Sequence, residues 1–108
     1  MKNFFIHADI ESQDLGGGAV RKVLAHSENL MLVEINFDKG AIGALHKHPH
    51  EQCSYVKAGA FEFEIDGVKK IVREGDTTYI HPEALHGVVC LEKGVLVDVF
   101  TPERKDFL

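Results

Sequence analysis

The sequence predicts an all-β protein in which many short strands form a roll of two packed sheets. Runs rich in Val, Ile, Phe and Tyr recur along the chain, and turn signals separate them every ~8–12 residues. No stretch of the 108 residues sustains the apolar period of 3.6 that marks an amphipathic helix, so little helix is expected. This spacing favours a sandwich or barrel, and a double-sheet roll leaves few open strand edges.

The first strands are expected at 20–26 and 30–37, where Val, Leu, Met and Ile dominate and Ser-Glu-Asn forms the intervening turn. The Leu-Gly-Gly-Gly segment at 15–18 reads as a flexible loop. Residues 60–65 alternate between Phe or Ile and Glu, which predicts a strand with one buried face.

The second half of the chain continues this pattern. Asp66-Gly67 is a strong hairpin signal, and it predicts that 68–73 returns as the partner strand. A short strand is expected at 76–80, ended by the proline that follows. Two more strands, at 87–91 and 95–100, should be joined by a turn at Glu-Lys-Gly 92–94.

Composition limits the possible partners. With 44% apolar residues we expect one domain over residues 1–108. No apolar run approaches the ~20 residues of a membrane span, and Asp9 and Glu11 cut short any secretory signal, so no membrane association and a cytoplasmic location are expected. In the cytoplasm, Cys53 and Cys90 should be reduced thiols packed in the core. A net charge of −5 without a Lys/Arg cluster argues against nucleic acid but permits a small anionic substrate.

Two blocks of sequence carry residues that can bind a metal ion. The first holds His46, His48 and, four residues later, Gln52, whereas the second holds His86. On an extended strand residues i and i+2 point to one side, so the first two histidines can share an ion that His86 approaches from another strand. Each histidine alone could be an ordinary surface or core residue. Their joint spacing, framed by glycines, favours a metal site.

Three imidazoles and an amide oxygen suit a divalent transition metal ion, and the ligand types leave open whether it is Zn, Ni, Mn, Fe or Co. None of these ligands carries a negative charge. The ion would therefore keep its charge, attract an anionic substrate and retain open positions for substrate or water.

The two blocks resemble the motifs of the cupin superfamily, Gly-x5-His-x-His-x3-4-Glu-x6-Gly and Gly-x5-Pro-x-Gly-x2-His-x3-Asn. The matching residues are Gly40, His46, His48, Gly59, Gly75 and His86. Gln52, His81, Glu83 and Cys90 replace the Glu, Pro, Gly and Asn of the motifs. The resemblance implies a cupin-type double-stranded β-helix, a jelly-roll barrel. The loss of the glutamate puts oxidative chemistry at a three-His, one-carboxylate site in doubt.

The chain is more specifically similar to small single-domain cupins of the KdgF family of pectin-degradation proteins. The shared segments are 40–52, 61–65, 86–92 and 98–108, within a similarity that runs from Gly16 to Leu108. This resemblance implies an enzyme that linearises 4,5-unsaturated uronates from pectin or alginate to 5-keto-4-deoxyuronate, a ring opening with tautomerisation, and a homodimer. It implies metal ligands at His46, His48, Gln52 and His86 and catalytic or substrate-binding roles at Asp98, Phe100 and Arg104.

The residues around Asp98 fit such a reaction. Ring opening leaves an enolate that must gain a proton at C4, and Asp98 is the candidate proton shuttle. It shares a strand face with Leu96 and Phe100 between apolar neighbours, so we expect partial burial and a raised pKa. Phe100 could press on the sugar ring, and Arg104 could pair with the substrate carboxylate. A solvated strand-end Asp, a core aromatic and a solvated tail arginine are the plain alternatives.

Two other functions stay open at this point. The chain could be a different metal-dependent cupin enzyme, such as a sugar isomerase or a dioxygenase, or a cupin that binds a sugar acid without turning it over. Oxygen consumption would indicate the dioxygenase, and tight binding without turnover would indicate the binding protein.

Overall fold

The computed structural model describes residues 2–108 and confirms the all-β prediction. Its strands are β1 (Gln13–Gly16), β2 (Ala19–Ser27), β3 (Leu30–Phe37), β4 (Ile42–His46), β5 (Glu51–Ile65), β6 (Val68–Arg73), β7 (Thr77–Ile80) and β8 (His86–Thr101). The only helical segments in this part of the chain are the single 3-10 turns η1 (His7–Asp9) and η2 (Lys105–Phe107). Neither has the length or apolar character to span a membrane.

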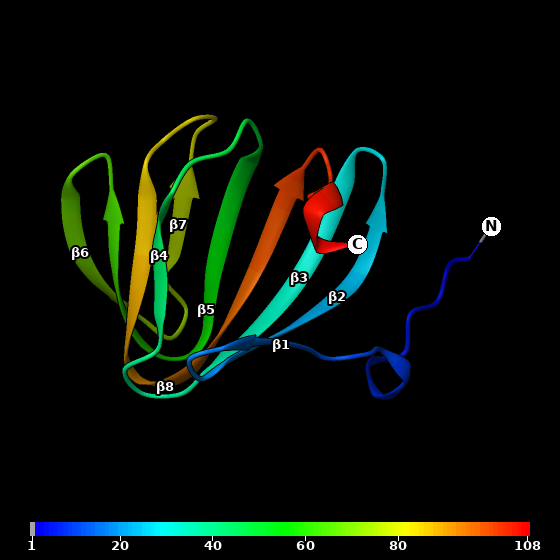
Figure 1. Cartoon of the computed structure of the whole chain (residues 1–108), viewed down its shortest axis with the longest axis horizontal. Coiled ribbons are helices and arrows are strands. Elements are labelled where there is room, and N and C mark those ends of the chain that lie inside the picture. Colours follow the sequence, from blue (N-terminus) through cyan, green and yellow to red (C-terminus); the bar gives the residue numbers. More distant parts are fainter. Residues whose placement is uncertain (1) are drawn as a thin grey trace.

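Two long antiparallel strands, β5 and β8, organise the roll. The first half of β5 pairs with β7 and with the second half of β8, beyond which follow β3, β2 and β1. The second half of β5 pairs with β6 and with the first half of β8, which also carries β4. The strands therefore curl into two facing layers, while the N-terminal residues extend away from them (Figure 1).

The apolar core lies between the two layers. The alternation predicted at 60–65 is confirmed, since Phe61 and Phe63 are buried and the intervening glutamates are only half-buried. Phe61 packs edge-on against Phe37 of β3, with ring centroids 5.4 Å apart. A smaller cluster consists of Met31, Val33 and Phe100.

The turns follow local backbone preferences. Asp66 and Gly67 join β5 to β6 with φ values of 49° and 82°, the paired left-handed conformations of a tight hairpin. Glu83, at a position where the cupin motif has glycine, also has a positive φ of 66°. The turn before His86 therefore keeps a backbone form that glycine adopts more easily.

Three local predictions were wrong. Residues 92–94 do not form a turn, because β8 runs unbroken through them alongside β5. The glycine-rich segment is partly ordered as β1, which pairs with β2. Cys90 is buried as expected, but Cys53 lies exposed on the outer face of β5.

The two layers are joined by a crease where β5 passes β8 at Gly59. The register of the pair shifts between Ala58 and Ala60, across this residue, and again between Val56 and Ala58 and between Ala60 and Phe61. Gly59 itself has a φ of 85°. A Cβ atom here would lie 2.6 Å from the carbonyl oxygens of Glu92 and Lys93, which is closer than backbone packing allows. The glycine therefore lets both long strands bend and serve both layers.

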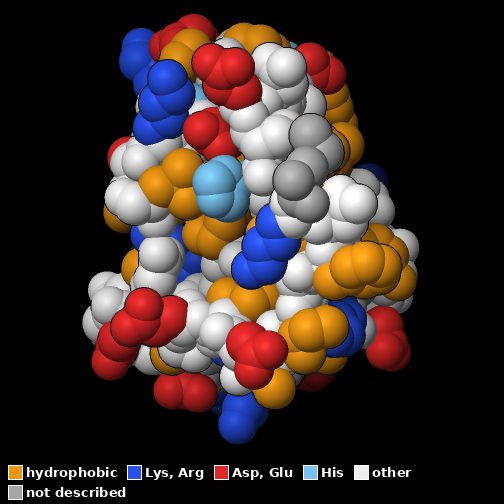
Figure 2. Space-filling view, turned by 90° about the vertical axis from the view of Figure 1, so that its right-hand side faces the viewer, with side chains coloured by type: hydrophobic (Ala, Val, Ile, Leu, Met, Phe, Trp, Pro, Cys, Tyr) orange, Lys and Arg blue, Asp and Glu red, His pale blue; other side chains and the backbone are white. Residues whose placement is uncertain are grey.

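The layer formed by β7, the first half of β5, the second half of β8, β3, β2 and β1 carries a row of apolar side chains on its outer face. Its members lie side by side on β7, β5, β8 and β3, namely Tyr79, Cys53, Val99 and Leu32. This row is the candidate contact surface for a second copy, and the homodimer stays a prediction that light scattering would test. Charged side chains of both signs are interspersed on the side of the molecule seen in Figure 2, without a basic stripe among the described residues there.

Gly59→Ala should destabilise the protein by on the order of 3 kcal/mol or more, because the added methyl group meets backbone atoms and the positive φ disfavours alanine. Gly67→Ala is the matched control, since Gly67 also has a positive φ of 82° but nothing lies within 4 Å of its added Cβ. We expect about 1 kcal/mol for the control. Urea unfolding measures both, and equal losses would show that the close approach at the crease contributes nothing.

Candidate functional site

The strand pairing brings the three predicted histidines together. His46 is the last residue of β4 and His86 the first of β8, and they are direct partners across the two strands. Their ring centroids lie 4.3 Å apart. His48 lies beyond the end of β4, yet its ring centroid is 5.5 Å from that of His46 and 4.9 Å from that of His86.

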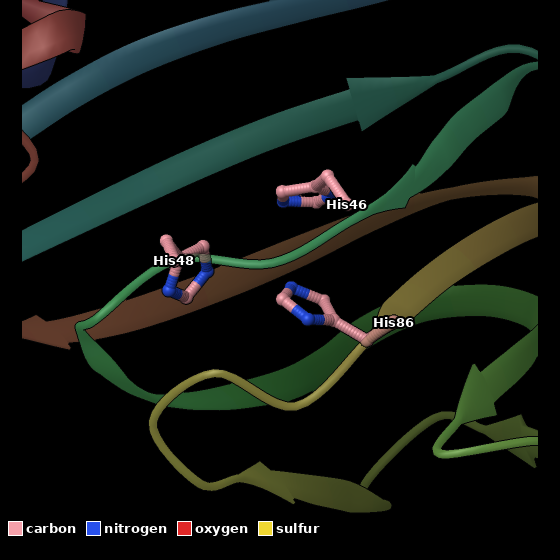
Figure 3. A group of neighbouring side chains, drawn as sticks. All are labelled: His46, His48 and His86. Carbon is pink, nitrogen blue, oxygen red and sulfur yellow. The ribbon is translucent and has the colours of Figure 1, made fainter.

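The three histidines come together in a different way from the one predicted. A single strand does not carry both His46 and His48, because β4 ends at His46 and Pro49 follows closely. All three rings nevertheless face one another, and one nitrogen from each lies within 4.8 Å of the others (Figure 3). The three-imidazole cluster suggests a metal site.

Each imidazole is oriented by a backbone carbonyl that accepts a hydrogen bond from Nδ1. These contacts measure 2.8 Å from His46 to Ala44, 3.2 Å from His48 to His50 and 2.8 Å from His86 to Ala84. An Nδ1 that donates leaves the Nε2 lone pair of a neutral ring free to bind a cation.

The electrostatics of the cluster keep the buried rings neutral. Burial, aided by the Arg104 charge, lowers the pKa of His48 to about 4. Burial also lowers the pKa of His86, despite the opposing hydrogen bond to Ala84. The Nε2 atom of His86 is buried and has no hydrogen-bond partner. A buried lone pair without a donor is what a metal ligand presents before it binds its ion.

Gln52 completes the donor set from β5. It is buried, and its Oε1 lies 3.0 Å from His48 Nε2. A neutral His48 has one N–H, which can donate either from Nδ1 to the His50 carbonyl or from Nε2 to Gln52 Oε1. In the Nδ1–H form two acceptor atoms face each other, an arrangement that a cation would stabilise. Adjacent ligands at about 2.1 Å from a divalent ion lie roughly 3 Å apart in octahedral and about 3.4 Å apart in tetrahedral coordination, so the residues present fit a divalent ion.

The predicted catalytic residues line the same cavity as His46, Gln52 and His86. The cavity has a volume of about 320 Å³, and Asp98, Phe100 and Arg104 contribute to its wall. This volume lies at the lower end of small-molecule sites, roughly 300–1,000 Å³. The structure therefore brings together in one place the residues that the sequence singled out.

Asp98 lies on the inner face of β8 and is buried, as expected. Burial raises the pKa of its carboxyl group to about 6, against the opposing effects of a hydrogen bond from Ser54 and the charge of Arg104. Its Oδ1 atom has no hydrogen-bond partner. The group can therefore exchange a proton near neutral pH.

Phe100 and Arg104 form an aromatic corner with Phe107 of η2. Phe100 is buried, and its ring meets the His48 ring edge-on at 5.9 Å. The Arg104 guanidinium lies 5.4 Å from the Phe100 centroid and 4.4 Å from that of Phe107. It donates to both carboxylate oxygens of Asp106, at 3.0 and 2.8 Å. Arg104 is thus held at the cavity and is not a free tail arginine.

Sequence analysis missed three residues of the site, namely Arg21, Phe107 and Ser54. Arg21 lines the cavity, and its guanidinium lies 3.6 Å from the Phe107 centroid. No sequence pattern marks Arg21 or Phe107 as a site residue, because their contact depends on tertiary structure. Ser54, fully buried beside Gln52, could have been found, since residues i and i+2 of a strand share a face.

Fold and site together define a cupin, and the sequence matches the cupin-domain family over residues 33–100. Over its full length the chain is 46% identical to the pectin degradation protein KdgF of Dickeya dadantii, with 100% of both proteins covered. The chain therefore belongs to the KdgF family of cupins.

Solved structures of related proteins have the same fold. An RmlC-like cupin from Shewanella frigidimarina superimposes with a TM-score of 0.96 at 42% identity, covering 100% of this chain and 97% of that chain. KdgF from a Halomonas species superimposes with a TM-score of 0.94 at 40% identity, and both chains are covered completely.

Asp98→Asn should change how the stability of the metal-free protein depends on pH. The pKa of the carboxyl group rises from 3.8 to about 6 on folding, so the native state binds the proton more tightly. The contribution of Asp98 to stability is therefore present at low pH and lost as the pH rises through this window. About two pKa units correspond to about 3 kcal/mol.

Relative to wild type, the variant should accordingly gain up to about 3 kcal/mol in free energy of unfolding between pH 4 and pH 7.5. Urea unfolding in the presence of a chelator measures this difference. A variant that tracks wild type equally at both pH values would show that Asp98 ionises normally in the fold.

Proposed function

We propose that this cupin is a metal-dependent enzyme of pectin or alginate breakdown that converts 4,5-unsaturated uronates to 5-keto-4-deoxyuronate. The observation that carries the proposal is a single cavity lined by His46, Gln52 and His86 of the metal-type cluster, by a buried carboxyl group with a pKa of about 6 and by an arginine. The full-length similarity to a pectin degradation protein supports this substrate class.

We assign the metal to His46, His48, Gln52 and His86, with the ion being Zn, Ni, Mn, Fe or Co. When bound, such an ion would supply positive charge that stabilises the developing enolate oxygen. The protein's part is to hold three imidazoles and an amide oxygen together, three of these four donors being buried, without a carboxylate that would cancel this charge.

The reaction is an isomerisation and needs no second reactant. Asp98 accepts the proton of the C1 hydroxyl as the bond between C1 and the ring oxygen breaks, which leaves an aldehyde at C1 and an enolate at C5. It then returns a proton to C4, and the enolate becomes the 5-keto group. A pKa of about 6 suits both steps, because the group is mostly ionised at pH 7 yet readily protonated.

Arg104 and Phe100 orient the substrate. The bonds from Arg104 to Asp106 use Nε and one terminal nitrogen, so hydrogens on the terminal nitrogens remain for the uronate carboxylate. Phe100 supplies a rigid apolar wall beside the His48 ring, against which a sugar ring can lie.

Metal-loaded protein should accelerate the loss of the conjugated-alkene absorbance of a 4,5-unsaturated uronate over the spontaneous rate in buffer. Treatment with a chelator should return the rate to that of buffer, and added metal should restore it, with elemental analysis recording occupancy. Oxygen uptake during the reaction would point to a dioxygenase instead. Tight uronate binding without turnover would make the protein a binder.

Arg104→Ala should raise KM for the unsaturated uronate about 10- to 100-fold with a smaller change in kcat, because a charge-assisted hydrogen bond to substrate is lost. Arg73→Ala removes an exposed arginine on β6 and serves as the control for the loss of charge. Inhibition by saturated galacturonate should weaken equally, whereas inhibition by neutral galactose should not change. An equal effect on both sugars would contradict carboxylate binding by Arg104.

A further inference from the structure

The side-chain amide of Gln52 has two different ends, and only its oxygen can bind a metal ion. In the structure the amide nitrogen donates a hydrogen bond of 2.9 Å to the hydroxyl oxygen of Ser54. This contact directs Oε1 toward His48 Nε2, 3.0 Å away. Ser54 has no exposed surface, so this partner for the Gln52 nitrogen is enclosed within the protein.

The hydroxyl group of Ser54 accepts from Gln52, because the amide nitrogen can only donate, and its own hydrogen stays available for a second partner. Asp98 lies directly opposite Ser54 in the pairing of β5 with β8, and the Ser54 hydroxyl group opposes the rise in the pKa of its carboxyl group, which is the effect of a donor beside a carboxylate. A carboxylate can only accept, so it fixes the direction of the contact. The result is a directed chain from Gln52 through Ser54 to Asp98.

We propose that Ser54 is a positioning residue that holds the amide oxygen of Gln52 toward the imidazole cluster. The proposal rests on the proposed function to the extent that Gln52 is a metal ligand. A glutamine at position 52 needs such a partner to orient its amide group. A glutamate there would present two equivalent oxygens and would need none. Without Ser54 the amide can turn, and its N–H groups can then take the lone pair of His48 that would bind the ion.

Ser54→Ala should weaken zinc binding about 10-fold or more, the range seen when a partner of a metal ligand is removed. Competition between the protein and a chromophoric chelator for Zn²⁺ measures this affinity without any turnover. Thr78→Val is the matched control, because Thr78 is the neighbour of Ser54 on β7 and also carries a buried hydroxyl group, but one without a hydrogen-bond partner. The control should bind zinc as wild type does.

The decisive comparison repeats Ser54→Ala in a Gln52→Glu background. A carboxylate offers an oxygen in either orientation, so the loss of zinc affinity there should fall below about 3-fold. Equal losses in both backgrounds, or no loss in the wild-type background, would overturn the role of Ser54. Unfolding of the metal-free variants checks that each one is folded.

The outcomes separate this proposal from the reaction. If wild type fails to bind zinc and the other candidate ions, the metal site itself is wrong, and the role of Ser54 falls with it. If wild type binds zinc and shows the background-dependent loss but does not turn over unsaturated uronates, only the proposed reaction fails.

Discussion

The site depends on one constraint, the hydrogen bonds that tie the Nδ1 atoms of three imidazoles to backbone carbonyls. These bonds leave the lone pairs facing one another, and burial lowers the pKa of both His48 and His86, so protonation of these two rings does not relieve the arrangement. A cation is the natural partner for such a cluster. The pairing of β4 with β8 places His46 beside His86, so a cation site at this cluster would depend on that backbone pairing.

The bend in the two long strands explains how residues far apart in the sequence line one cavity. His86 and Asp98 belong to the same strand, at its start and near its end, yet both line the cavity because β8 passes from one layer to the other. The crease at Gly59 makes this passage possible. A straight strand of this length would carry the two residues to opposite ends of a sheet, since each residue advances the chain by about 3.3 Å.

The sequence correctly predicted those features that depend on neighbouring residues alone. The alternation at 60–65 and the hairpin at Asp66-Gly67 were correct, because burial on one strand face and left-handed backbone conformations leave clear signals. The turn predicted at 92–94 was wrong, because Glu92 pairs with β5 and Gly94 pairs with Phe37 of β3, and these two partners keep the chain extended through Glu-Lys-Gly. The residues of the candidate site were brought together as expected, but the contacts of Arg21 and Phe107 depend on how η2 folds back and leave no mark on the sequence.

Two guanidinium groups, those of Arg21 and Arg104, lie against the single ring of Phe107 at the cavity, in a protein whose net charge is −5. A uronate in solution is therefore repelled by the molecule as a whole and attracted only at short range. At physiological ionic strength the Debye length is about 8 Å, so salt screens the distant repulsion more than the local attraction. If the substrate is the anionic sugar proposed above, its capture should thus tolerate, and at low concentrations benefit from, added salt, unlike capture by a uniformly basic surface.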